Sequence, residues 1–303
     1  IYTTIDHDTY DNNRNNYAYN FGFEKGLNKN FSFYGNYSES FRIPNIDENI
    51  KATTSGSFHL EDQESEGVEL GILYQNESLS FNASYYQMDT KNEIQYDQSV
   101  NTNLDPIERE GINVDFNYII DQRQNISTSI NVTEAEFTSG SLSMGTGTTE
   151  FEGIIYYLGN ETYGYGTNTA INYLGSDGTA NQSVNLAGRK VPLVPPLTFS
   201  IDYDRQIDNS TSFNFGIKYV DEKYVSNDQE NIEPKIPDYY LINTSLSKSS
   251  GNYNYKIGIN NLTNEKFYDF AISSTFHDDA HYGLTNVYPL PERNYFVDFK
   301  YTF

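Results

Sequence analysis

Hydrophobic and polar residues alternate along most of this chain with a period of two, which is the side-chain period of a β-strand. In the last ten residues, NYFVDFKYTF, one face of the predicted strand carries Tyr295, Val297, Phe299, Tyr301 and Phe303. The other face is polar except for Phe296. Similar runs recur upstream, beginning near residues 17, 31, 68, 79, 112, 126, 197, 213, 240 and 253. The pattern predicts an all-β chain of about twelve strands.

The connections between these runs alternate between short and long. Short, turn-like connections lie at 26–29, 75–77, 121–124, 207–210 and 249–252. Long connections lie at about 42–63, 90–108, 139–194, 225–237 and 264–290. Short turns at one end and long loops at the other are the layout of an up-and-down outer-membrane barrel. The sequence therefore predicts an antiparallel transmembrane β-barrel.

Barrel width indicates which face meets lipid. Periodicity alone does not distinguish the lumen from the outside, but a barrel of about twelve or more strands is too wide for its own side chains to fill. The Ser, Thr, Asn, Asp and Gly face is therefore predicted to line a wet lumen, and the aromatic face to contact lipid. No run of about 18 apolar residues exists, which excludes a transmembrane helix, whereas a transmembrane strand needs only roughly 9 to 11 residues.

Composition excludes several classes of protein. Aromatic residues make up 16% of the chain, with 28 Tyr and 19 Phe, which argues against disorder despite a mean hydropathy of -0.66. A net charge of -23 with only 19 Lys and Arg argues against nucleic acid as a partner. Cysteine is absent, which removes disulfides, thiolate metal sites and thiol nucleophiles. The first residues, IYTTIDHDTY, contain no signal peptide, so an exported protein with this sequence is expected to derive from a longer precursor.

Five stretches resemble, in the correct order, the barrel of TonB-dependent outer-membrane receptors. They are FSFYGNYSESFRIPNIDE (31–48), SEGVELGILYQNESLSFNASYYQMDTKNEI (65–94), GRKVPLVPPLTFSIDYD (188–204), GINNLTNEKFYD (258–269) and YPLPERNYFVDFKYTF (288–303). The resemblance runs from about residue 17 to the end. The terminal aromatic strand resembles the signal by which such barrels are recognised for assembly. The resemblance implies a location in the bacterial outer membrane and energised uptake of a scarce nutrient, with a ferric siderophore as the first expectation.

The chain departs from this family in size. Members resemble a 22-stranded barrel closed inside by an N-terminal plug domain that carries the energy-coupling box. This sequence has about half the strands, no plug and no coupling box. We therefore expect one domain, residues 1–303, that forms the C-terminal half of such a barrel. The resemblance implies partners that are a small-molecule nutrient, outer-membrane lipid, and the TonB energy-coupling complex through a plug absent from this chain.

Alternatives remain open for the function. Within the family, the nutrient could be haem, cobalamin or an oligosaccharide. A passive diffusion porin of twelve strands and a soluble extracellular β protein belong to other classes. We expect no enzyme, because no GxSxG elbow and no metalloprotease signature occurs.

Ligand contacts are expected in the long loops, because rigid strands position them. Residues 151–173 are rich in tyrosine and have the pattern of a hairpin within the longest loop. Its tyrosines offer a flat amphipathic surface to an aromatic or sugar ligand, although packing between loops would explain them too. They are Tyr156, Tyr157, Tyr163 and Tyr165. Three guanidinium groups near strand ends, Arg42, Arg189 and Arg293, are candidates to meet ligand carboxylates.

Metal and haem sites have weaker support. FHDDAH brings His277, Asp278, Asp279 and His281 together in a long loop, where they could bind a divalent cation or form a solvated acidic loop. IDHDTYD, which contains Asp6, His7 and Asp8, is a weaker candidate of the same kind. His59 follows FRIP in its loop and resembles the axial ligand of haem receptors in this family, but their NPNL motif is absent. No resident cofactor is expected beyond a divalent cation in these outer loops.

Overall fold

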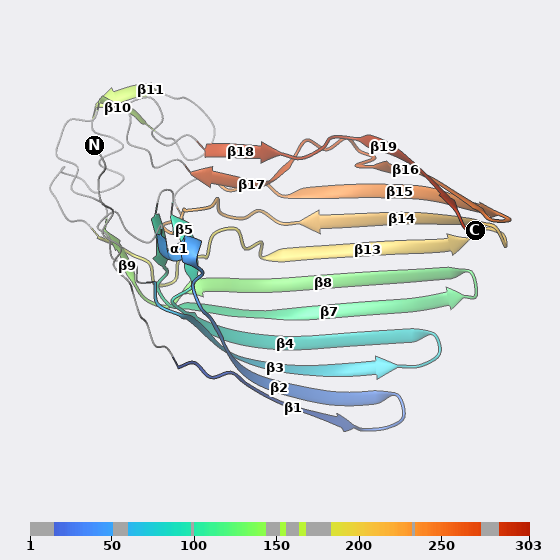
Figure 1. The fold of residues 1–303 in the computed structure, drawn as a ribbon, viewed down its shortest axis with the longest axis horizontal. Helices are drawn as coiled ribbons and strands as arrows, with labels where there is room; N and C mark the ends of the chain where they lie inside the picture. Colours follow the sequence, from blue (N-terminus) through green and yellow to red (C-terminus); the bar gives the residue numbers. More distant parts are fainter. Residues whose placement is uncertain are drawn as a thin grey trace, which may run out of the picture.

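The computed structural model describes residues 15–50, 60–97, 100–143, 152–155, 164–167, 183–231, 234–273 and 285–303. Within them, eleven strands form one antiparallel sheet in which each strand pairs with its neighbours in chain order (Figure 1). They are β1 (Tyr19–Gly26), β2 (Phe31–Arg42), β3 (Gln63–Gln75), β4 (Leu79–Lys91), β7 (Ile107–Asp121), β8 (Gln124–Phe137), β13 (Leu197–Gln206), β14 (Thr211–Val220), β15 (Tyr239–Ser250), β16 (Tyr253–Asn260) and β19 (Asn294–Tyr301). Each of the eleven alternating runs in the sequence has become one of these strands.

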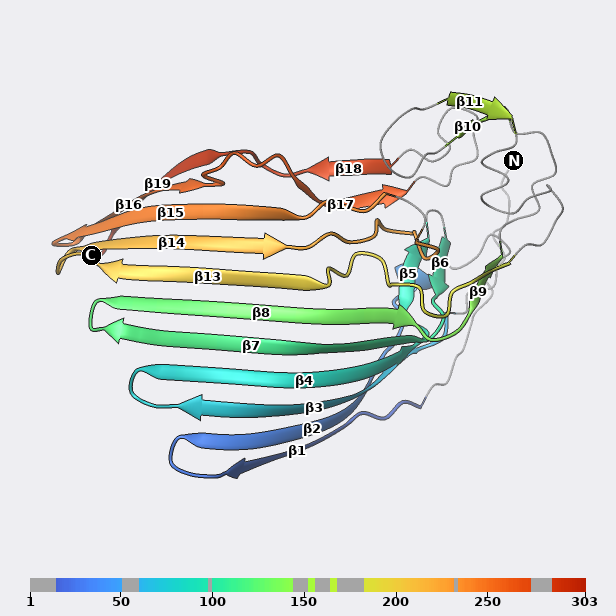
Figure 2. The ribbon, with the colours of Figure 1, turned by 180° about the vertical axis from the view of Figure 1, so that it is seen from behind.

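Smaller elements lie in the connections at one end of the sheet. They are the short helix α1 (Ile46–Ile50) and four hairpins or strand pairs, β5 (Ile94–Asp97) with β6 (Val100–Asn103), β9 (Ser141–Ser143) with β12 (Ser183–Asn185), β10 (Glu152–Ile155) with β11 (Gly164–Thr167), and β17 (Tyr268–Ser273) with β18 (Thr285–Pro289). The hairpin expected within 151–173 is β10–β11. Figures 1 and 2 show these elements gathered at one end, which we call the loop end, and tight turns at the other, the turn end.

The sheet is open, which is where it differs from a complete barrel. β1 and β19 form its two edges and do not pair with each other. Both strands run from the loop end to the turn end, so they are parallel (Figure 1). The prediction of an antiparallel up-and-down sheet is confirmed, and an open half is what the strand count predicted.

Short turns at the turn end are stabilised by side chains that bond to their own backbone. Between β13 and β14, Asp208 Oδ1 accepts hydrogen bonds from the backbone N–H groups of Ser210, at 2.7 Å, and Thr211, at 2.9 Å. The bonds from the Ser210 backbone and hydroxyl, and from Thr211, lower the pKa of Asp208 to about 2. Asn28 and Asn76 accept similar bonds in two other turns. Asx residues therefore close these turns, as their local hydrogen bonding favours.

Strand register puts apolar side chains side by side on one face of the sheet. One row across seven adjacent strands, β3 to β15, consists of Ile72, Ala83, Val114, Ile130, Phe199, Tyr219 and Tyr240. On the opposite face, the neighbouring row is Asn82, Asp115, Ser129, Ser200 and Lys218. Among the described residues, no protein layer covers the apolar face, since Phe21 is 64%, Val132 46% and Val297 79% exposed. A face this apolar and this uncovered has the character of a lipid-contacting barrel wall.

Phe296, the aromatic exception on the polar face of the last strand, covers a glycine. Gly258 lies directly opposite it on β16, and a Cβ atom at that position would collide with the Phe296 ring. The Lys256 ammonium lies 5.7 Å from the centre of the same ring. Tyr34 covers Gly71 in the same way on the polar face. Aromatic rings on this face therefore shield glycine backbone, a known device for sheet stability.

The apolar face ends, toward the loop end, in a row of acidic residues. Five carboxylates lie directly opposite one another on five adjacent strands, namely Glu39, Glu66, Asp89, Glu108 and Glu136. The Tyr37 hydroxyl donates to Glu39 or Glu66, and Lys190 pairs with Glu136. Within the described part of the chain, neither Asp89 nor Glu108 has a cationic partner. Like charges opposite each other destabilise a sheet, so this row opposes strand pairing.

Buried apolar side chains gather at the loop end, not along the sheet. One cluster joins Ile107, Ala135 and Phe137 at the ends of β7 and β8 to Leu186 and Val191. By strand alternation, its three strand residues belong to the polar face. The segment that contains Leu186 and Val191 lies beside the end of β8, since the Phe137 N–H donates to the Arg189 carbonyl and the Val191 N–H to the Ala135 carbonyl, both at 2.9 Å.

Substituting arginine on the two faces of β13 tests their assignment. Ile201→Arg should block barrel assembly in the receptor that carries this chain, because a cation near the bilayer midplane costs about 2 to 4 kcal/mol. Asp202→Arg, one residue along and on the polar face, should assemble. Heat-dependent mobility on an SDS gel reports assembly. Equal tolerance of both substitutions would contradict the assignment of the apolar face to lipid.

Removing one charge from the acidic row should stabilise the sheet. Asp89→Asn is expected to raise the midpoint of the heat-dependent gel shift, by the equivalent of about 0.2 to 1 kcal/mol at low ionic strength. The gain should fade in roughly 1 M salt, where charges are screened beyond about 3 Å. Asp115→Asn is the control, since its neighbours across the sheet, Asn82 and Ser129, are uncharged. A gain that persists in high salt would show that repulsion is not its cause.

Candidate functional site

Most residues predicted to bind ligand or metal lie outside the described residues. They are His59, Tyr156, Tyr157, Tyr163, His277, Asp278, Asp279 and His281, together with Asp6, His7 and Asp8. Tyr165 lies in β11, opposite Ile154. The contacts of Arg42, Arg189 and Arg293 are described, and they separate into two groups.

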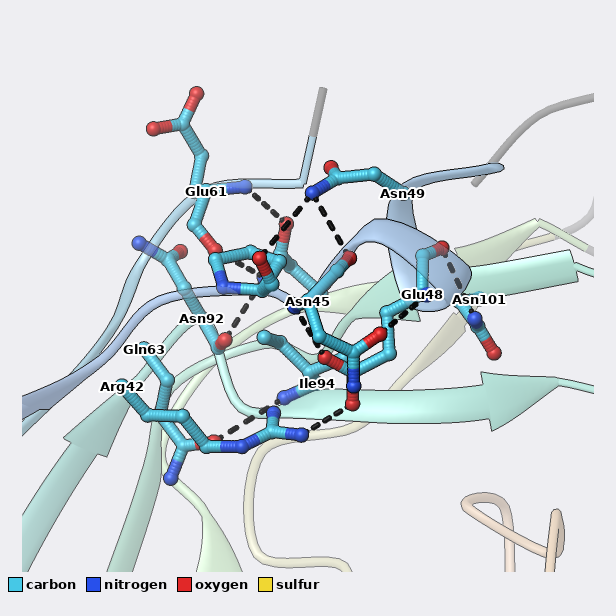
Figure 3. Close-up of polar contacts among 11 residues, drawn as sticks. Arg42, Asn45, Glu48, Asn49, Glu61, Gln63, Asn92, Ile94 and Asn101 are labelled. Atoms are coloured by element: carbon cyan, nitrogen blue, oxygen red, sulfur yellow. Dashed lines mark hydrogen bonds and ion pairs between the residues drawn. The ribbon is translucent and has the colours of Figure 1, made fainter. Parts of the chain in front are cut away.

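Arg42 ends β2 and takes part in the polar network of the loop that follows (Figure 3). Asn45 Oδ1 accepts from the Glu48 backbone N–H at 2.8 Å, and Glu48 Oε2 accepts from the Asn45 N–H at 2.8 Å. This reciprocal pair is a capping box that starts α1. The Arg42 guanidinium forms an ion pair with Glu48 Oε1. Arg42 therefore ties the end of the strand to the helix, with part of its side chain still exposed.

The Glu48 carboxylate remains charged in this network. Burial opposes its ionisation, but the hydrogen bonds from the Asn45 backbone and from Arg42 outweigh burial, and the pKa of Glu48 lies below its ordinary value. An aspartate or glutamate in the first turn is also favoured by the helix dipole. The sequence carried a signal for this arrangement, because Asn-x-x-Glu after Pro44 is the pattern of a capping box.

Asparagine side chains extend the network to the next loop. Asn101, which is 5% exposed, donates to the Glu48 carbonyl at 3.0 Å. Asn103 accepts from the Glu61 N–H at 2.7 Å and donates to the Asn92 carbonyl at 2.8 Å. Asn49 accepts from the Leu60 N–H at 3.2 Å. The loop after β2 and the β5–β6 hairpin are thus joined by side-chain amides, a role that the sequence analysis did not foresee.

Arg189 and Arg293 differ from Arg42 in having no ionic partner within the part of the chain that the structure describes. The backbone of Arg189 is fixed, since its carbonyl accepts from Phe137 N–H at 2.9 Å. The Arg293 N–H donates to Asn264 Oδ1 at 3.0 Å. Among the described residues, no carboxylate lies within ion-pair distance of either guanidinium. Both groups are therefore available to an anionic ligand, on backbone that is held in place.

The polar face carries an open hollow of about 350 Å³ between β4 and β13. Strand residues that line it are Ser80, Asn82, Asp115, Asn117, Ser127, Ser129, Ser200 and Asp202. Their hydroxyl, amide and carboxylate groups can bind water or polar groups but offer no cation to an anionic ligand. This agrees with the wet lumen that the alternation predicted.

Metal binding and membrane-spanning helices find no support in the described part of the chain. It contains no group of three or more His, Asp or Glu side chains placed to hold a metal ion. It also contains no helix long and apolar enough to cross a membrane. The predicted metal cluster at 277–281 lies outside these residues and stays a prediction.

Comparison with known structures identifies the same sheet in larger proteins. The ferric yersiniabactin uptake receptor FyuA from Yersinia pestis is 14% identical to this chain, with a TM-score of 0.66. The match covers 94% of this chain and 37% of the FyuA chain. The siderophore receptor PiuA from Acinetobacter baumannii is 16% identical with a TM-score of 0.62, covering 93% and 35%. The copper transporter OprC is 14% identical with a TM-score of 0.63, covering 93% and 38%. At these identities the likeness establishes the fold, and the chain spans little more than a third of each relative.

Sequence comparison establishes the family. No curated protein matches the chain. The model of the TonB-dependent receptor-like β-barrel, however, matches residues 2–262, which is most of the chain. This family consists of outer-membrane transport receptors, not enzymes, and the assignment decides against the porin and the soluble β protein. With its open eleven-stranded sheet, its apolar outer face and its long loops at one end, this chain belongs to the TonB-dependent receptor β-barrel family.

Proposed function

We propose that this chain is part of an outer-membrane receptor that takes up a ferric siderophore by energised transport. The observation that carries the proposal is the family match over residues 2–262 combined with the names of the structural relatives. FyuA is a ferric yersiniabactin uptake receptor, PiuA a siderophore receptor, and a third relative, PfeA from Pseudomonas aeruginosa, a ferric enterobactin receptor. Energy would come from the TonB complex through a plug supplied outside this chain.

The charges of the loop end favour a ligand that carries its own metal. The chain has a net charge of -23, which repels a bare anion. A ferric complex reduces the charge of the chelating groups, and Arg189 and Arg293 are placed to meet the oxygens that remain. Arg42 contributes less in this proposal, since Glu48 already occupies its guanidinium.

The loop tyrosines would supply the remaining contacts. We propose that Tyr156, Tyr157, Tyr163 and Tyr165 hold the flat part of the ligand, since a phenol combines an apolar face with a hydrogen-bonding end. The loop residues His59, His277, Asp278, Asp279 and His281 are proposed as further contacts. The similarity to OprC supports a second candidate, copper, for which these His and Asp side chains are suitable ligands.

Charge removal at the two free arginines tests the ligand class. Arg189→Gln and Arg293→Gln should each weaken binding of a ferric siderophore about tenfold or more, because each removes a charge-assisted hydrogen bond of roughly 1.5 to 3 kcal/mol. Arg42→Gln serves as the matched control and should change affinity less than about threefold. Binding is measured with radioactive iron on outer membranes that contain the intact receptor. Equal affinity for all three variants and the parent would remove the arginines from the site.

Loop deletions test where the ligand binds. Deleting residues 152–172 or 276–282 separately should reduce affinity, because each removes proposed contacts while the eleven strands of the main sheet remain. Assembly is checked by heat-dependent gel mobility, and uptake is compared for a ferric siderophore, haem, cobalamin and copper. Unchanged affinity in both assembled deletions would place the site elsewhere in the receptor. If the receptor takes up copper and none of the other three compounds, copper replaces the ferric siderophore as the proposed cargo.

A further inference from the structure

Three segments of the loop end meet in one small apolar core. We call residues 186–196 the strap, residues 221–231 with 234–238 the crossing loop, and the paired strands β17 and β18 the hairpin. Val225 and Ile236 of the crossing loop are each 1% exposed, and Ala271 of the hairpin is fully buried. Leu193 of the strap and Tyr268 of the hairpin pack against them. Segments nearly eighty residues apart in sequence thus bury apolar surface together.

Backbone hydrogen bonds cross between the same segments. The Ser226 N–H donates to the Ala271 carbonyl at 2.8 Å, which joins the crossing loop to the hairpin. The Leu193 N–H donates to the Tyr224 carbonyl at 2.9 Å, which joins the strap to the crossing loop. Asn231 reinforces the second junction, since it accepts from the Lys190 N–H at 2.6 Å and donates to the Lys190 carbonyl at 2.8 Å. Each segment is therefore bonded to the next.

The strap adopts a backbone conformation that it could not keep alone. Leu193 has a φ of 63°, in the left-handed region that bulky residues rarely enter. Such a residue persists only where its surroundings hold it in place. Leu193 is held by its bond to Tyr224 and by the apolar core, so this part of the strap depends on the crossing loop, whereas Arg189, Val191 and Pro196 bond to β8.

An ion pair between a buried ammonium and a half-exposed carboxylate fastens the crossing loop to the hairpin. Lys223 Nζ donates to Asp269 Oδ1 at 2.7 Å, and the side chain of Lys223 is only 8% exposed. The Tyr239 hydroxyl donates to the same oxygen at 3.0 Å, and Tyr239 is 4% exposed. Burial opposes ionisation of Asp269, but Lys223 outweighs burial and lowers the pKa of Asp269. A buried ammonium that loses its carboxylate is left uncompensated, so this pair is costly to break on one side.

We propose that the strap, the crossing loop and the hairpin open and close as one unit, latched by the ion pair between Lys223 and Asp269. A ligand that contacts one of the three would then displace or order all three together. This cooperativity goes beyond the proposed uptake function and does not depend on which nutrient is carried.

Amide hydrogen exchange on the intact receptor tests the latch. Asp269→Asn keeps the size of the side chain but removes its charge, which leaves the buried Lys223 ammonium without a counter-ion. Exchange in peptides that contain Leu193, Ser226 and Ile236 should accelerate together, by about tenfold or more, as expected for an uncompensated buried ammonium. Glu222→Gln is the matched control, since its partner in the same loop, Lys235, is 35% exposed and stays solvated. It should accelerate exchange less than about threefold.

Whether exchange accelerates in one peptide or in all three decides between separate segments and one unit. Acceleration limited to the Ser226 peptide, or equal effects of Asp269→Asn and Glu222→Gln, would overturn the proposal. If Asp269→Asn prevents assembly, the double variant Lys223→Met/Asp269→Leu replaces both charges with apolar groups. Recovery of protection in all three peptides would support one unit, and recovery in the crossing loop alone would refute it.

Discussion

The hydrogen-bond ladder of the sheet is the constraint on which the rest of this structure depends. Lipid offers no partner to backbone N–H and C=O groups, so a strand in a membrane must be paired on both sides. Eleven strands satisfy this condition for each other, except along the outer sides of β1 and β19. Because these two strands are parallel, they cannot close the sheet antiparallel to each other. A closed antiparallel barrel that contains this sheet therefore includes an odd number of further strands, which a 22-stranded barrel satisfies.

The ladder also explains where the stabilising contacts are found. A wide barrel wall is a single layer, so its two faces contact lipid and water instead of a protein core. Along the strands, side chains can only stabilise their neighbours across the sheet, as Phe296 does over Gly258. The buried clusters of the described residues lie at the loop end, where connecting segments pack against strand ends and against one another. Within the described residues, tertiary packing is therefore concentrated beside the loops that are expected to bind ligand.

Sequence alternation predicted the strands because a strand with lipid on one side and water on the other must alternate. This is why runs as different as LTFSIDYD and NYFVDFKY both identified strands. Alternation did not explain why Phe296 lies on the polar face. The explanation is Gly258, 38 residues upstream, which the register of β16 and β19 places opposite Phe296. The sequence did not reveal the acidic row either. Glu39, Glu66 and Asp89 are far apart in sequence, and only register places them opposite one another.

The loop end was predicted least well, and the reason is physical. Loop residues are fixed by single contacts, not by a repeating pattern, so a sequence suggests what a side chain can bind but not what it does bind. Arg42 was predicted to contact ligand from its charge and its place at a strand end. The structure places it there in an ion pair with Glu48, and its contact with ligand stays a prediction. The Asn-x-x-Glu capping box contained that information, because it fixes Glu48 one turn from the end of β2.

Arg189 and Lys223 illustrate the opposite case. Neither lies in a motif that predicts its surroundings. In the folded chain, Arg189 has no ionic partner among the described residues, whereas Lys223 is buried beside Asp269. A charge held ready for a ligand and a charge used by the fold are indistinguishable in the sequence. What separates them is whether the fold of the connecting segments brings a carboxylate within reach.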